Sequence, residues 1–205
     1  MQEHNPYAAP TAPVADTGVP ENAFANAEQE VEYGGFWRRV GAQVLDALIL
    51  APLGLLAYFG AQFSRLFYLY WLVPSVLIAL FYSVYLVRRY GGTPGKRILD
   101  LRIVMTDGSP ITGSAAFLRY SVMLVLSTIP SIGMAIAALK LPAEGYDSLG
   151  FLERTQLLTV NTPPWALFVS YTIWVWMLAL IIVMLCNPRR RAVHDFIAGT
   201  LVIRT

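Results

Sequence analysis

Four long runs of apolar residues, separated by polar segments, dominate the hydrophobic pattern of this sequence. They cover residues 36–63, 66–87, 116–139 and 164–186, and each is long enough to cross a bilayer, which takes about 20 helical residues. The chain of 205 residues is 56% hydrophobic and only 14% charged, with a mean hydropathy of +0.53. This composition excludes an ordinary soluble domain. The pattern therefore predicts an all-α integral membrane protein with four transmembrane helices.

The polar segments between these runs predict smaller elements. Apolar and charged residues alternate over 99–105, which predicts a short strand or a β-hairpin-like segment at the membrane surface. A second strand-like run at 201–203 could pair with it. The segment 140–162 precedes the fourth run and is expected to contain a short surface helix over 149–160.

The first 34 residues differ in composition from the rest of the chain. They are rich in Pro, Ala, Asn and Glu, a mixture that buries too little apolar surface to offset the entropy lost on ordering. We therefore expect a disordered tail over 1–34 and a membrane domain over 35–205. The tail lacks a basic region followed by an apolar one, so we expect the first helix to act as the targeting signal.

Basic residues gather on one side of the predicted four-helix arrangement. Of the 15 Lys and Arg residues, 12 fall on that side, and only three fall on the other: Arg65, Lys140 and Arg154. By the positive-inside rule, both termini and the loop between the second and third helices are cytoplasmic. The same basic clusters are expected to contact the anionic lipid headgroups of the bilayer, not nucleic acid.

A single acidic residue, Asp46, interrupts the first apolar run and is the main candidate for a functional site. On a helix, Arg39, Gln43 and Asp46 share one face. A charged side chain at membrane depth costs about 2.5–3.5 kcal/mol on insertion scales, so it needs a reason to be there. Arg39 and Arg119 are its candidate partners. Two interpretations remain open: a buried Arg–Asp clamp between helices, or an ion or proton site at which Asp46 titrates.

His194 and Asp195 follow the last basic cluster and form a second candidate. Adjacent residues do not share a helix face, and the other histidine of the chain lies in the tail, so a zinc site is not expected. Asp195 is expected to cap a turn or to pair with an arginine at the cytoplasmic mouth, such as Arg39. We favour this structural role over a catalytic one.

A glycine-rich motif follows the second helix: Gly92, Thr93, Pro94, Gly95 and Lys96. A phosphate-binding loop requires a glycine five residues before its Gly-Lys pair and a Ser or Thr after it, where this chain has Tyr90 and Arg97. The motif instead favours a sharp turn in which Lys96 and Arg97 face lipid headgroups. No histidine lies within any of the four runs, and no nucleophile–base pair is evident, so neither an enzyme nor a bound cofactor is expected.

Three separated motifs resemble, in their order, the RDD family of bacterial multi-spanning membrane proteins, which is named for one arginine and two aspartates. The motifs are residues 36–39 with Asp46, residues 92–96 leading into 101–108, and residues 194–200. The resemblance covers 36–204. It implies that Arg39 is the family arginine and that Asp46 and Asp195 are the two aspartates.

The resemblance also implies a bacterial cytoplasmic (inner) membrane protein of undefined molecular role. Transport of unidentified ligands has been suggested for the family, and sodium/proton exchange has been attributed to some members. Our leading expectation is transport or exchange of a small ion, a proton or sodium, or of a small ligand, centred on Asp46. The alternative is a non-transporting assembly or regulatory subunit, in which the Arg–Asp network only holds the helices. A homo-oligomer is compatible with either.

Overall fold

Four long apolar helices make up most of the computed structural model, which describes residues 32–142 and 146–205. The four are α2 (Phe36–Phe63), the helix that begins as α3 (Phe67–Leu80), α6 (Gly113–Lys140) and α8 (Pro164–Cys186). Each is long and apolar enough to cross a membrane, which confirms the predicted fold class. The disorder predicted for the tail concerns residues 1–31, which lie outside the described residues.

The second span is longer than predicted and is not a uniform α-helix. After α3 the chain makes a π-helical turn at Phe81–Tyr85 and continues as α4 (Leu86–Tyr90), ending at Gly91 in a left-handed conformation, with φ 73°. The expected turn at Pro94 and Gly95 is instead the short helix α5 (Pro94–Ile98). Proline suits the first turn of a helix because its fixed φ is already helical and its missing N–H has no partner there anyway.

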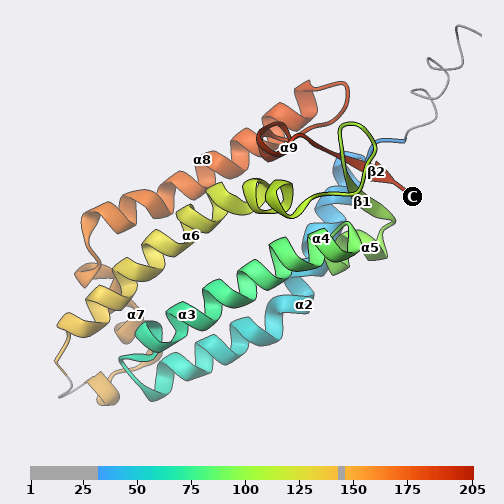
Figure 1. The fold of residues 1–205 in the computed structure, drawn as a ribbon. Helices are drawn as coiled ribbons and strands as arrows, with labels where there is room; N and C mark the ends of the chain where they lie inside the picture. The colour runs from blue at the N-terminus through green and yellow to red at the C-terminus, as the bar shows by residue number, and fades with distance from the viewer. Residues whose placement is uncertain (1–31, 143–145) are drawn as a thin grey trace, which may run out of the picture. The chain divides into compact units, whose positions relative to one another are not determined.

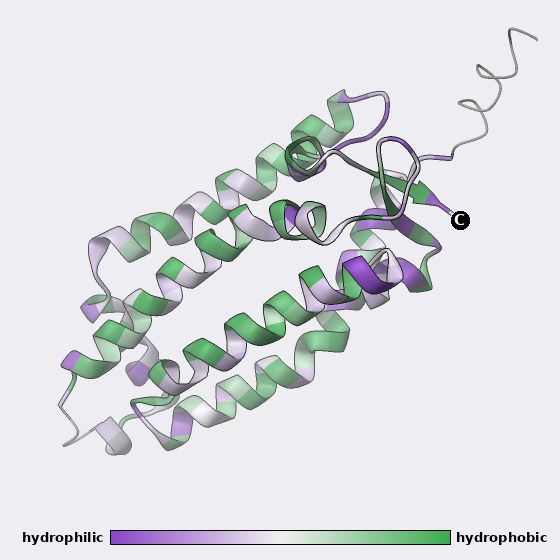
Figure 2. Ribbon diagram, viewed as in Figure 1, coloured by the Kyte–Doolittle hydropathy of each residue, from purple (hydrophilic) through white to green (hydrophobic). Residues whose placement is uncertain are grey.

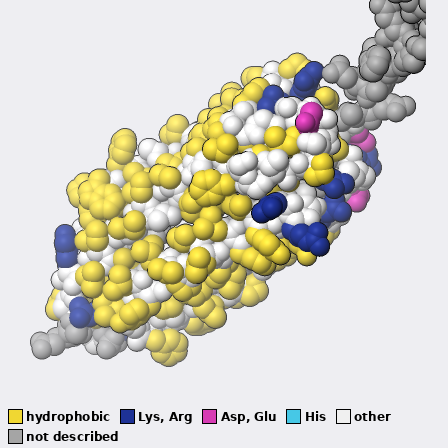
Figure 3. Space-filling view, viewed as in Figure 1, with side chains coloured by type: hydrophobic (Ala, Val, Ile, Leu, Met, Phe, Trp, Pro, Cys, Tyr) yellow, Lys and Arg dark blue, Asp and Glu magenta, His cyan; other side chains and the backbone are white. Residues whose placement is uncertain are grey.

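The helices lie in the order α8, α6, α3, α2 when followed across Figure 1. The contact between α6 and α8 is close, because a Cβ added to Gly133 of α6 would collide with the side chain of Ala166 on α8. Hydrophobic residues predominate along the four long helices in Figure 2, and apolar side chains cover much of the face seen in Figure 3. Exposed residues of this kind include Leu48, Trp174 and Ile182. Such a surface is suited to contact with lipid chains.

A two-stranded sheet closes one end of the bundle. β1 (Leu101–Met105) pairs antiparallel with β2 (Thr200–Arg204), so the predicted strand and its pairing with the run at 201–203 are both confirmed. Tyr33 forms a bridge with Ile203, and the N–H of Gly34 donates to the carbonyl of Val202. Two residues of the predicted tail thus lie beside β2 and bond to it.

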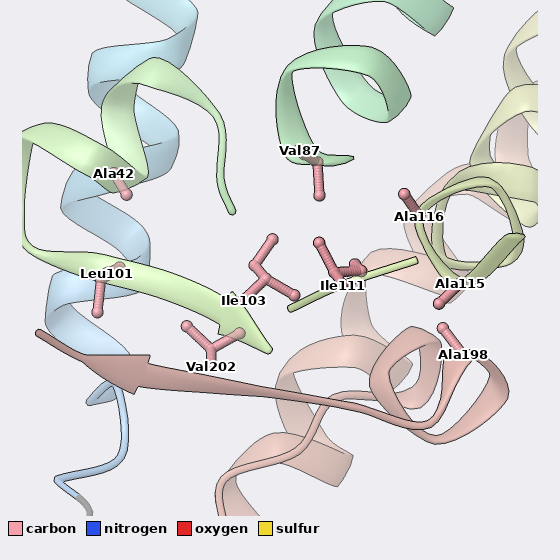
Figure 4. Close-up of a cluster of buried hydrophobic side chains, with 9 residues drawn as sticks. All are labelled: Ala42, Val87, Leu101, Ile103, Ile111, Ala115, Ala116, Ala198 and Val202. Carbon is pink, nitrogen blue, oxygen red and sulfur yellow. The ribbon is translucent and has the colours of Figure 1, made fainter. Parts of the chain in front are cut away.

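An apolar core lies beneath this sheet and fixes the elements around it (Figure 4). It draws its buried side chains from α2, α4, β1, the loop before α6, α6, β2 and the short helix α9 (Val193–Ala198): Ala42, Val87, Leu101, Ile103, Ile111, Ala115, Ala116, Ala198 and Val202. We call the end of the bundle that carries the sheet the basic end, since 12 of the 15 Lys and Arg residues belong to its elements and loops.

The opposite end carries the predicted surface helix, found as α7 (Phe151–Asn161). Its Arg154 is buried and donates from Nη1 to the carbonyl oxygen of Gln62 at 2.6 Å and from Nε to that of Tyr146 at 3.0 Å. These bonds fasten α7 to the end of α2. The basic end therefore holds the candidate site, and this end holds none of its residues.

Candidate functional site

Asp195 lies at the centre of a buried ionic cluster at the basic end. Its side chain is fully buried, and its Oδ2 accepts from Arg39 Nη1 at 3.2 Å and from the N–H of Ala192 at 3.0 Å. Its Oδ1 forms an ion pair with Arg119 and accepts from the hydroxyl of Thr200 at 3.2 Å. One carboxylate thus ties α2 and α6 to α9 and β2.

The two arginines keep this carboxylate ionised. Burial by itself would raise the pKa of Asp195, but the charges of Arg119 and Arg39 outweigh it, and the pKa falls to about 2. Burial and the charge of Arg119 lower the pKa of His194 to about 3. Arg119 Nη2 lies 2.9 Å from His194 Nε2 and can only donate, so this nitrogen accepts and the ring is neutral. The 3.6 Å approach of His194 to Asp195 is therefore not an ion pair at neutral pH.

Asp46 occupies a second, separate cluster. Its side chain is buried, with a residue exposure of 5%. Oδ1 accepts from the hydroxyl of Tyr82 at 2.5 Å and from the N–H of Gly95 at 2.7 Å, while Oδ2 accepts from the hydroxyl of Thr93 at 2.6 Å. Three protein donors therefore converge on this carboxylate, and both of its oxygens have hydrogen-bond partners.

The local backbone explains how these donors reach Asp46. A Cβ added to Gly95 would lie 2.7 Å from Asp46 Oδ1 and would press on the carbonyl of Ala42, so only glycine lets α5 approach α2 this closely. Tyr82 lies in the π-helical turn of the second span. A π turn inserts a residue into the helix and so changes which side chains face the neighbouring helix.

Lys96 lies between the two clusters. Its ammonium donates to the hydroxyl of Thr93 at 3.3 Å, and its charge interacts with those of Arg119, Asp46 and Asp195. The Lys96 side chain is half-buried, whereas that of Arg97 is exposed. Of the two basic residues expected to face lipid headgroups, only Arg97 is on the surface.

The three residues predicted to share one helix face, Arg39, Gln43 and Asp46, have different surroundings in the structure. Arg39 binds Asp195, Asp46 is bonded by the donors described above, and Gln43 is exposed on α2. Within the described residues no ion pair joins Asp46 to Arg39 or Arg119. For Arg39 the physical reason is its distance from Asp46: seven helical residues span about 10 Å along the axis, which is too far for a direct bond.

Sequence reasoning also missed two members of the site. Tyr82 and Thr200 are not among the candidate residues that the sequence indicates. The sequence offers one signal for Tyr82: it is a phenol near the end of the second span, which leads into the glycine-rich motif and lies on the same side of the bilayer as Asp46. Thr200 follows Gly199, whose positive φ of 63° ends α9 and turns the chain back beside Asp195.

These features define a multi-pass α-helical membrane protein in which buried carboxylates join the first span to later elements of the chain. The chain belongs to the RDD family, whose sequence profile matches residues 33–199. It is similar to "Uncharacterized protein YckC" of Bacillus subtilis (strain 168), with 37% identity over 90 residues, or 42% of this chain. The match spans about half of that relative's length, 55%.

The chemistry open to the site is narrow. Among the described residues, no group of three His, Cys, Asp or Glu side chains is placed to hold a metal ion. Both carboxylates accept hydrogen bonds from donors of several elements. The arrangement is therefore well suited to joining helices, and each joint depends on one carboxylate.

Proposed function

We propose that this protein is a non-transporting membrane module, an assembly or regulatory subunit whose two carboxylates act as structural clamps. The observation that carries the proposal is the environment of Asp46: 5% exposure, with three donors from the protein itself. The alternative from the sequence thus becomes the preferred interpretation, and ion transport becomes the second candidate.

Transport at Asp46 would require that these contacts be given up and remade. A hydrogen bond to a charged group contributes about 1.5–3 kcal/mol, and removing Asp46 from its three donors would disrupt all of them together. A hard cation also takes several oxygen ligands. Within residues 32–142 and 146–205, Asp46 is the only carboxylate of this cluster, and its oxygens already accept from Tyr82, Thr93 and Gly95.

One observation favours the second candidate, proton exchange at Asp46. Among the described residues no Lys or Arg forms an ion pair with its carboxylate, unlike that of Asp195. A neighbouring hydroxyl, Tyr82, lies on a π-helical turn, and such turns are frequent at functional sites. A carboxyl group without a fixed cation is the kind that can take up a proton.

The proposal places the chain in the bacterial cytoplasmic membrane with both termini in the cytoplasm. The support is the distribution of positive charge, with 12 of 15 basic residues at the end that holds both α9 and the start of α2. We assign no enzymatic activity. The single histidine of the described residues, His194, is already bonded to Arg119. The oligomeric state stays a prediction.

The discriminating experiment compares the parent protein with Asp46→Asn in sealed vesicles. Asparagine keeps the shape of the side chain but cannot carry a charge. Proton and sodium fluxes are measured alongside the amount of folded protein, with Asp107→Asn as the control, because Asp107 is exposed and bonds to Ser109 within its own turn. We expect no flux that depends on Asp46. A flux in the parent that is lost in a well-folded Asp46→Asn variant would overturn the proposal and establish the transport candidate.

A further inference from the structure

The loop between α8 and α9 brings a run of arginines to the start of α2. The loop turns at Asn187, whose side chain accepts from the N–H of Arg189 at 2.9 Å and whose carbonyl accepts from that of Arg190 at 2.9 Å. A Cβ added to Gly35 would lie 3.9 Å from Arg190 Nη1, and the charge of Arg190 acts on that of Arg39. Residues about 150 positions apart in the sequence therefore form one cationic site.

This site has more positive charge than its carboxylate can balance. Arg39, Arg119 and Arg191 all bond to Asp195, the last through Nη2 to the Asp195 carbonyl at 3.0 Å. Arg190 adds a further positive charge beside them, and His194 is neutral. Within the part of the chain that the structure describes, the carboxylate of Asp195 thus lies among four guanidinium groups.

Two guanidinium nitrogens of this site are also left without an acceptor. Arg39 Nη2 and Arg191 Nε are buried, and neither has a hydrogen-bond partner among the described residues. A buried charged donor without a partner is costly, and nearly all such groups in folded proteins are satisfied. Both nitrogens are closed to solvent, so an anion bound at the surface beside Arg190 would act on them through its charge, which reduces the excess of positive charge.

The backbone conformation of Arg190 also indicates a functional position. Arg190 has φ 50°, in the left-handed region that a side chain with a Cβ rarely adopts. Its side chain is exposed, so no core packing accounts for this strained conformation. Strain of this kind often accompanies functional positions. Here it holds the Arg190 side chain over the start of α2.

A hollow of about 400 Å³ lies beside Arg190 and is of mixed character. Its apolar part comes from the end of α8, with Met184, Leu185 and Cys186, and its polar part from Asn187 and Arg190. The end of α8 exposes apolar side chains such as Leu185, which is 59% exposed. A ligand that fills this hollow needs an apolar portion and a head group rich in hydrogen-bond acceptors. A free inorganic anion lacks the apolar portion.

We propose that the phosphate group of an anionic phospholipid binds at the exposed Arg190, beside the buried guanidinium groups of Arg39 and Arg191, with its glycerol and upper acyl chain against the end of α8. Arginine is suited to this role, because its planar donors match phosphate oxygens. The site is built into the α8–α9 loop and is distinct from a diffuse attraction of the basic end to a charged membrane surface. It does not depend on the clamp at Asp46, which takes no part in it, but it shares Arg39 and Arg191 with the cluster at Asp195.

The test measures lipid binding by the full-length protein with Arg190 replaced. Arg190→Gln removes the charge, and Arg190→Gly removes the side chain at a backbone conformation that glycine adopts freely, so at least the second variant should fold as the parent does. Purified protein is exchanged into micelles that contain phosphatidylglycerol and phosphatidylcholine, and retained lipid is counted by native mass spectrometry. Arg89→Gln is the matched control, an exposed arginine of α4 at the same end of the bundle.

We expect the parent to retain phosphatidylglycerol in preference to phosphatidylcholine, and both Arg190 variants to bind it at least about tenfold more weakly. Arg89→Gln should lower the affinity by no more than about fivefold, the effect of one charge near an anionic surface. Equal losses in the Arg190 and Arg89 variants would overturn the proposal in favour of diffuse attraction. Thermal stabilisation by inorganic phosphate, without a matching effect of phosphatidylglycerol, would overturn the lipid assignment and indicate a free-anion site.

Discussion

Replacing Asp195 with asparagine should destabilise the protein strongly. The side chain keeps its size, so the change removes charge and not volume. Arg39 and Arg119 would then lie buried without their shared counterion, because Asp195 is fully buried and contacts both. Removing one partner of a buried ion pair costs about 3–5 kcal/mol. A second route gives a lower figure: a fall in pKa from 3.8 to about 2 corresponds to about 2 kcal/mol in favour of the ionised form.

We therefore expect Asp195→Asn to lose about 2–5 kcal/mol of unfolding free energy. Reversible unfolding in mild detergent, followed by circular dichroism at neutral pH, measures this loss. Asp107→Asn serves as the control, because this exposed carboxylate bonds to Ser109 within its own turn. The control should change stability by no more than about 0.5 kcal/mol. If Asp195→Asn unfolds within that same margin of the parent, the Arg39–Asp195–Arg119 cluster does not stabilise the fold as we infer.

Three further predictions concern single residues. Gly95→Ala should destabilise the protein by about 1–3 kcal/mol, because the new methyl group would push α5 from α2; Gly54→Ala, where an added Cβ meets nothing within 4 Å, should be near neutral in the same unfolding assay. Gly133→Ala should cost a similar amount by separating α6 from Ala166 of α8, and an unchanged stability would contradict their close contact. Stability should fall as the pH is lowered from about 6.5 towards 3, by up to about 1.4 kcal/mol per pH unit from His194, since the unfolded ring takes a proton that the folded ring refuses. His194→Gln should remove this part of the pH dependence, and an identical acid profile for parent and variant would refute it.

Much of the fold follows from local pattern. A bilayer span requires about 20 apolar residues in a helix, so the lengths of the four runs alone predict the four long helices. The alternation over 99–105 predicts β1, and the run at 201–203 predicts its partner strand, because period-two patterning is specific to strands. Element ends were less accurate: α6 begins at Gly113 and not at residue 116, since a helix can continue into residues that do not enter the membrane.

The site was only partly predictable, because its contacts are non-local. The partner of Arg39 lies 156 residues away, and the donors to Asp46 come from two later elements. No periodicity in α2 indicates that Tyr82 turns inward at a π-helical turn, since this depends on an irregularity in another helix. The glycine-rich motif shows the same limit. Its composition predicts a tight turn of the backbone. Only the structure shows that Gly95 lies against Asp46, where a larger residue would collide with the carboxylate.

The most direct test of the clamp at Asp46 is hydrogen exchange at the backbone amides of α5. Asp46 holds this helix through the N–H of Gly95 and the hydroxyl of Thr93, so α5 should be protected in the parent protein. In Asp46→Asn we predict exchange about 10–100-fold faster over α5, the effect of losing a charged hydrogen bond, with exchange in α9 unchanged. If α5 exchanges at the same rate in both proteins, or is already unprotected in the parent, Asp46 is not a clamp.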